Sequence, residues 1–114
     1  MNQACIRVAS VRDFDSATVV EFSTGQGDWP MRGFVLQVGE AFCAYINRCP
    51  HAGHALNLSP GAFFDRSGNY LICSSHGAMF EPGTGVCVAG PCPGETLAPL
   101  ECEVVGDDLY IRTP

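Results

Sequence analysis

Short apolar runs, separated by glycine- and proline-rich turns, recur along the whole chain. Residues 33–38 and 41–47 are two such runs joined by Gly39-Glu40, which is the spacing of a β-hairpin. Between residues 100 and 104, apolar and acidic side chains alternate. This period is typical of a strand with one buried face, and it places Cys102 in the core.

No stretch has the 3.6-residue period of an amphipathic helix, so the sequence predicts an all-β fold. Residues 13–16 are turn-like, and residues 24–30 contain two glycines and a proline, as a loop does. The other expected strands span residues 4–8, 17–22, 63–65, 70–72, 78–81, 86–88, 97–105 and 109–112. With 114 residues the chain can bury one modest core, and we expect a single domain over residues 1–114.

Composition and charge exclude several classes of protein. An apolar content of 46% with 16% charged residues excludes a disordered chain. No run approaches the roughly 18 apolar residues of a membrane span, and residues 1–10 show no basic region followed by an apolar stretch. We therefore expect a cytoplasmic protein without a membrane anchor. The net charge of −6 argues against nucleic acid as a partner. It fits either docking on a basic protein or a charge that only maintains solubility.

Two pairs of metal-ligating residues lie in the middle of the chain. They are Cys49-Pro50-His51 and Cys73-Ser74-Ser75-His76, with 21 residues between His51 and Cys73. Zinc modules mostly pair Cys with Cys and His with His. One Cys and one His in each loop instead suits a two-iron, two-sulfide cluster, in which one iron binds two thiolates and the other two imidazoles. A structural zinc site remains the alternative at this point.

From about Gly33 to Arg112 the sequence resembles the Rieske proteins, because of these two ligand pairs. The resemblance implies a Rieske-type antiparallel β-sandwich with a small cluster-binding subdomain of two ligand loops, at about residues 45–93. Such a domain carries one [2Fe-2S] cluster and transfers single electrons. The implied ligands are Cys49, His51, Cys73 and His76. The implied neighbours of the cluster, several of them through backbone amides that donate to sulfur, are Gly53, His54, Ser75, Gly77 and Pro91.

Residues near the second ligand pair predict a low reduction potential. High-potential respiratory members of the family have two hydroxyl side chains that donate hydrogen bonds to cluster sulfurs, and the matching residues here are Ala78 and Phe80. Those members also have a disulfide across the cluster, and the matching residues here are His54 and Ser75. Within the Rieske range of about −150 to +300 mV, we therefore expect a potential toward the lower end.

These features predict a ferredoxin-like one-electron carrier that serves an oxygenase or a reductase and performs no substrate chemistry itself. Its partners would be redox proteins, reached by electrostatic docking. The chain contains neither G-x-G-x-x-G nor a P-loop, and it is too short to include the mononuclear-iron domain of a Rieske oxygenase. The alternative in another class is an accessory small subunit of a larger reductase, although such subunits usually lack the ligands.

Seven cysteines exclude a complete disulfide framework, because the number is odd. Residues 89–94 form a proline-containing loop that resembles the loop covering the cluster in the Rieske family; Cys87 lies just before it and Cys92 lies within it. A disulfide between them would stiffen that loop. In a cytoplasmic protein we expect two reduced thiols instead.

Overall fold

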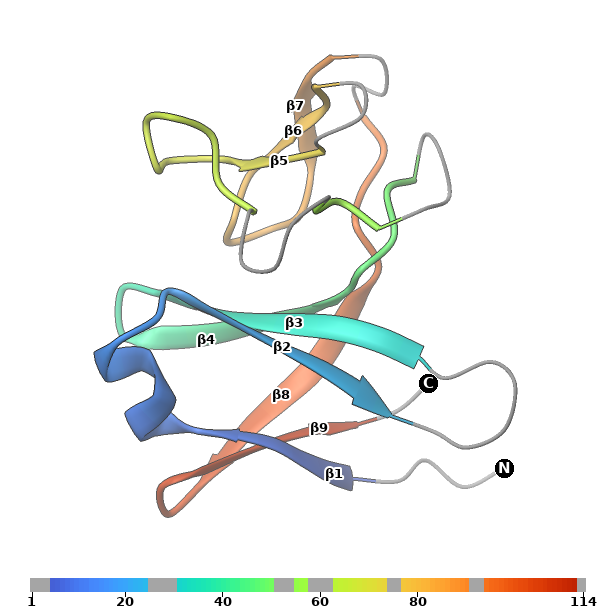
Figure 1. Cartoon of the computed structure of the whole chain (residues 1–114). Coiled ribbons are helices and arrows are strands. Elements are labelled where there is room, and N and C mark those ends of the chain that lie inside the picture. The colour runs from blue at the N-terminus through green and yellow to red at the C-terminus, as the bar shows by residue number, and fades with distance from the viewer. Residues whose placement is uncertain are drawn as a thin grey trace. The chain divides into compact units, whose positions relative to one another are not determined.

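The computed structural model describes residues 5–24, 31–50, 55–57, 63–73, 77–90 and 94–112, and it confirms the all-β prediction (Figure 1). Its one helical element among these residues is a single 3-10 turn. In chain order the elements are β1 (Cys5–Ser10), η1 (Val11–Asp15), β2 (Val19–Thr24), β3 (Met31–Val38), β4 (Ala41–Ile46), β5 (Leu71–Ile72), β6 (Met79–Phe80), β7 (Cys87–Ala89), β8 (Pro99–Val105) and β9 (Asp108–Arg112).

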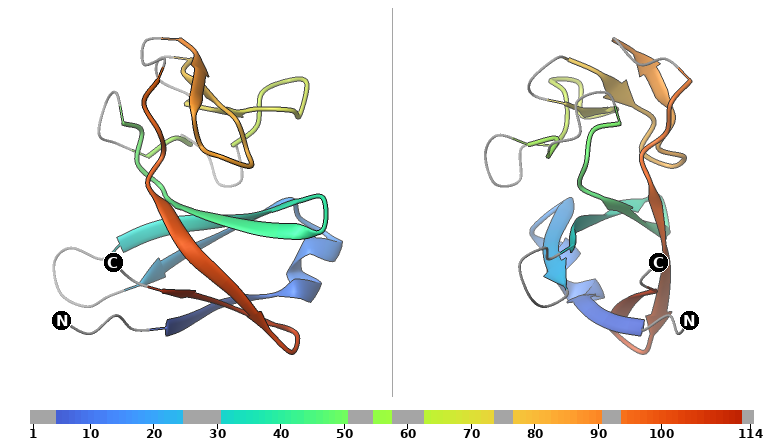
Figure 2. Two further views of the ribbon diagram at one scale, coloured as in Figure 1. Left: turned by 180° about the vertical axis from the view of Figure 1, so that it is seen from behind. Right: turned by 90° about the vertical axis from the view of Figure 1, so that its right-hand side faces the viewer.

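The chain divides into two compact units, one formed by residues 1–46 and 99–114 and the other by residues 47–98. We call them the sheet unit and the ligand unit. The sheet unit is one antiparallel sheet in the order β1-β9-β8-β4-β3-β2. Strand β8 pairs first with β4, through Pro99 and Leu100, and then with β9, through residues 101–105. Because β8 changes partner along its length, the sheet curls until its edge strands β1 and β2 approach each other (Figure 2).

The core of the sheet unit lies inside this curled sheet. Its buried members come from five strands and are Ala9, Val35, Ala44, Leu100, Leu109 and Ile111. Cys102 packs against them, as its place in the alternation predicted, but it is only partly buried. Val104, two residues further along β8, is 46% exposed. The alternation therefore predicts the face of β8 correctly, but the end of the strand runs beyond the core.

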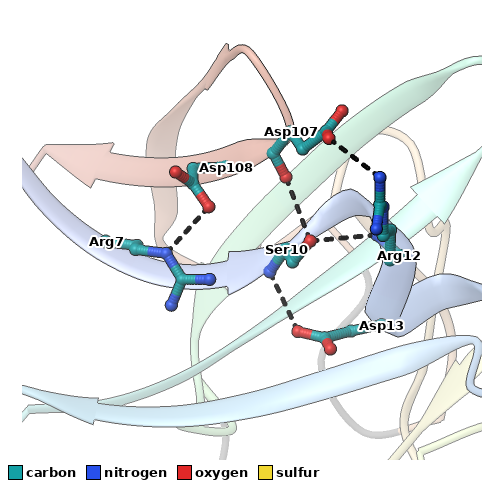
Figure 3. Close-up of polar contacts among 6 residues, drawn as sticks. All are labelled: Arg7, Ser10, Arg12, Asp13, Asp107 and Asp108. Carbon is teal, nitrogen blue, oxygen red and sulfur yellow. Dashed lines mark hydrogen bonds and ion pairs between the residues drawn. The ribbon is translucent and has the colours of Figure 1, made fainter.

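A capped turn joins β1 to the β8–β9 hairpin (Figure 3). The sequence read residues 13–16 as a plain turn, whereas the structure has the 3-10 helix η1 at Val11–Asp15. Ser10 caps it: the Ser10 N–H donates to Asp13 Oδ2 at 2.9 Å, and Ser10 Oγ accepts from the Arg12 N–H at 3.2 Å. This is a capping box, which satisfies backbone donors at the start of a helix. The Val11 N–H and Ser10 Oγ both donate to the Asp107 carbonyl oxygen, at 2.8 and 3.2 Å.

The ligand unit contains the three-stranded antiparallel sheet β5-β6-β7. Strands β6 and β7 form the predicted hairpin, whose turn is closed by hydrogen bonds between Glu81 and the residues Gly85 and Val86. The predicted hairpin before Cys73 is also present. Its two arms are linked by an isolated bridge between Phe64 and Leu71 and by backbone hydrogen bonds from Asp65 to Tyr70 and from Ile72 to Phe63. In the part of the chain that is described, no helix is long and apolar enough to cross a membrane.

Candidate metal centre

Cys73 directly follows β5 and begins a short loop, residues 73–78, that we call the second ligand loop. The Cys73 N–H donates to the Ala78 carbonyl oxygen at 2.8 Å, and the Gly77 N–H donates to the Cys73 carbonyl oxygen at 2.9 Å. Gly77 has φ +72°, a backbone conformation that glycine adopts without steric cost. The backbone alone therefore closes this loop at the positions described.

Cys49 lies in the segment that continues from β4, and we call residues 48–55 the first ligand loop. The residues on either side of this loop are linked by the side chain of Asn47. Its Oδ1 accepts the Leu56 N–H at 2.9 Å, and its Nδ2 donates to Asn57 Oδ1 at 2.9 Å. A side chain, rather than backbone pairing, makes these two contacts across the loop.

Both predicted thiolate ligands are removed from water. Cys49 and Cys73 are 0% exposed, whereas four of the other five cysteines range from exposed to buried and the fifth, Cys92, lies outside the described residues. The apolar side chains of the ligand unit that are also fully buried are Leu56, Phe63, Leu71, Ala78, Phe80 and Leu97. Two buried thiols at the starts of two closed loops are suitable donors for an iron–sulfur cluster, because thiolate is the ligand that such clusters take. The residues present therefore fit the cluster.

The other predicted site residues lie outside the described part of the chain, with one exception. They are His51, Gly53, His54, Ser75, His76 and Pro91. The exception is Gly77, whose N–H closes the second ligand loop as described above. Among the described residues no group of three or more His, Cys, Asp or Glu side chains gathers at one point, since both ligand histidines fall outside this part.

Residues 90–94 of the proline-containing loop, which we call the proline-containing segment, contact the rest of the ligand unit at both of their ends. At one end a Cβ on Gly90 would lie 2.7 Å from Ala78 Cα, so the two backbones are in direct contact. At the other end the Gly94 N–H donates to the Cys87 carbonyl oxygen at 3.3 Å. The Cys87 side chain is buried, and its Sγ lies 3.2 Å from the Ala89 carbonyl oxygen. The prediction that Cys87 and Cys92 are two reduced thiols involves Cys92, which lies outside the described residues.

Sequence reasoning missed two residues at this site. Asn47 looked like the last residue of a strand, and only the contacts of its side chain across the loop give it a role. Gly90 was assigned to the proline-containing segment, but its contact with the backbone of Ala78 depends on tertiary structure. A polar residue at the end of an apolar run was the only signal for Asn47.

Comparison with known proteins agrees with the site. The chain matches the Rieske [2Fe-2S] domain over residues 4–106. It belongs to this family. As a Rieske domain it binds one [2Fe-2S] cluster, which decides against the structural zinc site.

Individual relatives show how far the Rieske similarity extends. The ferredoxin CarAc of Metapseudomonas resinovorans is 29% identical over 111 residues, which are 97% of this chain and 95% of CarAc. The oxidoreductase NdmD of Pseudomonas putida is 43% identical over 61 residues, which are 54% of this chain but only 10% of NdmD. A chain in the complex of reduced oxygenase and oxidized ferredoxin in carbazole 1,9a-dioxygenase superposes with a TM-score of 0.71 at 25% identity, covering 96% of this chain and 94% of that one.

Proposed function

We propose that this protein is a ferredoxin-like one-electron carrier whose cluster is held by two Cys/His pairs, one on each ligand loop. The ligands are Cys49, His51, Cys73 and His76. The observation that carries the proposal is the complete burial of Cys49 and Cys73 at the starts of two short closed loops of one unit. We propose further that the sheet unit and the ligand unit together form one Rieske domain over residues 1–114.

When bound, a [2Fe-2S] cluster supplies a centre that accepts and releases one electron without a proton donor or a substrate from the protein. The chain's own residues bind it and exclude water. Cys49 and Cys73 present sulfur atoms with no solvent exposure, and the buried ring of Phe80 and methyl group of Ala78 add no competing polar group. The protein therefore acts as a carrier, and substrate chemistry belongs to its partner.

The potential of this carrier lies toward the lower end of the Rieske range. Ala78 and Phe80 are both fully buried, so neither the side chains themselves nor surface water reaching them supplies a donor at these two positions. Hydrogen bonds to the sulfurs stabilise the extra negative charge of the reduced cluster, and their loss lowers the potential. A midpoint toward about −150 mV follows.

The partners are redox proteins of an oxygenase system. CarAc, similar to this chain over nearly its whole length, is a ferredoxin, and the carbazole 1,9a-dioxygenase structure contains an oxygenase together with a ferredoxin. The protein works as a soluble cytoplasmic component. The match to a small part of NdmD favours a second candidate function, a component of a larger reductase, which stable co-purification with other subunits would reveal.

Docking to these partners is driven by charge at long range. The net charge is −6, yet the ligand unit contains only two arginines, Arg48 and Arg66, against the three carboxylates Asp65, Glu81 and Glu95. The sheet unit therefore carries −5 of the total. Substituting Glu101 and Glu103 by Gln should weaken the salt dependence of the association rate more than substituting Glu81 and Glu95, as stopped-flow measurements at several NaCl concentrations would show.

Low-temperature EPR of the dithionite-reduced protein, with iron and sulfide analysis, tests the proposal. We expect two irons and two sulfides per chain and a rhombic signal with an average g of about 1.9. Separate Ala substitutions of Cys49 and Cys73 should each abolish the signal, whereas Ala at the exposed Cys5 should leave it unchanged. A full cluster in either ligand variant would refute the ligand assignment.

A further inference from the structure

The two ligand loops are closed in different ways. The second ligand loop is closed by backbone hydrogen bonds in both directions, between Cys73 and the residues Ala78 and Gly77, at 2.8 and 2.9 Å. In the first ligand loop, where residues 48–50 and 55 are described, two hydrogen bonds that link the flanking residues come from one side chain, that of Asn47. A backbone closure depends little on which residues form the loop, but a side-chain closure depends on one residue.

Asn47 is well placed to make its contacts strong. It is only 7% exposed, so water does not compete effectively for its amide. Oδ1 and Nδ2 each make a 2.9 Å hydrogen bond, and the Leu56 N–H that Oδ1 accepts is buried. Removing the amide would leave that buried donor without its acceptor, which is more costly than losing an exposed hydrogen bond.

We propose that Asn47 is the positioning residue of the first ligand loop: its amide side chain holds the two ends of the loop together, and thereby keeps Cys49 in place as a ligand of the cluster. This inference rests on the proposed function for the identity of Cys49 as a ligand. Asn47 does not touch the metal in this proposal. Asn47 directly precedes the loop, and its side chain binds Leu56 and Asn57, which directly follow the loop.

Three variants separate this role from a general loss of stability. Asn47→Ala removes both hydrogen bonds across the loop. Asn57→Ala removes the bond from Asn47 Nδ2 and keeps the one from the Leu56 N–H. Asn69→Ala is the matched control, because Asn69 is an exposed asparagine of the same unit, in the turn before β5, and its turn contact with Ser67 uses its backbone N–H.

Hydrogen–deuterium exchange of the holoprotein, followed by mass spectrometry, measures the closure directly. In Asn47→Ala we expect peptides covering residues 48–57 to exchange roughly ten-fold faster, because one net hydrogen bond changes an opening equilibrium by up to about that factor. Peptides covering residues 73–80 should be unchanged. A rise of equal size in both loops would mean a general loss of stability and would overturn the proposal.

Cluster retention supplies the second readout. The rate at which visible absorbance disappears in excess bathophenanthroline disulfonate, after reduction, should be highest for Asn47→Ala, intermediate for Asn57→Ala and equal to the parent for Asn69→Ala. The reduced EPR signal of Asn47→Ala should also broaden, as its loop adopts a wider range of positions. Release rates identical to the Asn69→Ala control would contradict the proposal.

Failure of this inference can be told apart from failure of the proposed function. If Cys49→Ala still binds a full cluster, the ligand assignment is wrong, whatever Asn47 does. If Cys49 is required but Asn47→Ala changes neither local exchange nor release, only the positioning role is wrong. Should Asn47→Ala not fold, Asn57→Ala decides: it must exchange faster over residues 48–57 and release the cluster faster than Asn69→Ala, or the proposal fails.

Discussion

A single methyl group added at Gly90 tests whether the proline-containing segment must touch the second ligand loop. Gly90 has φ +93°, and a Cβ there would lie 2.7 Å from Ala78 Cα and 3.1 Å from both Ala78 N and the Gly77 carbonyl oxygen. All three atoms belong to the backbone, so no side chain can rotate away to make room. Either the proline-containing segment or the second ligand loop has to move.

The structure offers a matched control for this change. Gly94, at the other end of the same segment, has φ +89°, and among the described residues nothing lies within 4 Å of a Cβ built there. A left-handed backbone costs an alanine about 1–2 kcal/mol at either position. Overpacking adds a further ~1–3 kcal/mol at Gly90 alone. We therefore expect Gly90→Ala to destabilise the protein by about 2–5 kcal/mol and Gly94→Ala by about 1–2 kcal/mol.

Thermal unfolding of the two holoprotein variants, side by side with the parent, measures this difference. With about 4 °C of Tm per kcal/mol for a domain of this size, Gly90→Ala should melt roughly 4–12 °C below Gly94→Ala. The visible circular dichroism of the cluster should change in Gly90→Ala and not in Gly94→Ala. Equal losses of Tm with unchanged cluster spectra in both variants would refute the direct contact between the two backbones.

Three further predictions concern the potential, the pH dependence of stability and thiol reactivity. Ala78→Ser should raise the midpoint potential by about 59 mV for each ten-fold preference of the new hydrogen bond for the reduced cluster, as redox titration would show. The pKa of the Asp65 carboxyl is lowered, chiefly by the hydrogen bond that the Ser67 hydroxyl donates to it. The contribution of Asp65 to stability is therefore present above the pKa of the unfolded chain, about 3.9, and is lost as the pH falls through the lower pKa of the folded protein. Asp65→Ala should therefore have a lower free energy of unfolding than the parent at pH 7 and the same free energy of unfolding in acid, as urea unfolding at both pH values would show. Burial raises the pKa of the Cys43 and Cys102 thiols, so iodoacetamide at pH 7.5 should alkylate the exposed Cys5 first, by peptide mass spectrometry.

Most of the fold could be predicted from the sequence because its signals are local. The hairpin expected at residues 33–47 is present as β3 and β4 with the predicted two-residue turn, since alternation and turn residues act within a few positions. The helix η1 was missed even though Ser10 and Asp13 have the spacing of a capping box. There the signal existed, but the five-residue element is too short to show a helical period.

For the site, the sequence predicts the chemistry but not the contacts that hold the loops. Two Cys/His pairs at short spacing identify the chemistry, because few metal centres take one thiolate and one imidazole from each of two loops. What holds the loops is not visible in that spacing. The contact of Gly90 with Ala78 joins the residue that follows β7 to the residue that precedes β6, and the role of Asn47 appears only when Leu56 and Asn57 are seen beside it. These contacts depend on the tertiary structure, which periodicity and spacing do not predict.

Because the two ligand loops are closed in different ways, we expect them to tolerate substitutions differently. The second ligand loop is closed by backbone atoms, and its exit is in turn packed against Gly90. Substitutions of side chains within that loop, other than the proposed ligands Cys73 and His76, leave these backbone contacts in place, so they change the surroundings of the cluster more than its retention. The first ligand loop depends on the amide of Asn47, so there a single side chain alters retention. Because Asn47 and Gly90 act on separate loops and share no hydrogen-bond partner among the described residues, changes at these two residues should add rather than compensate.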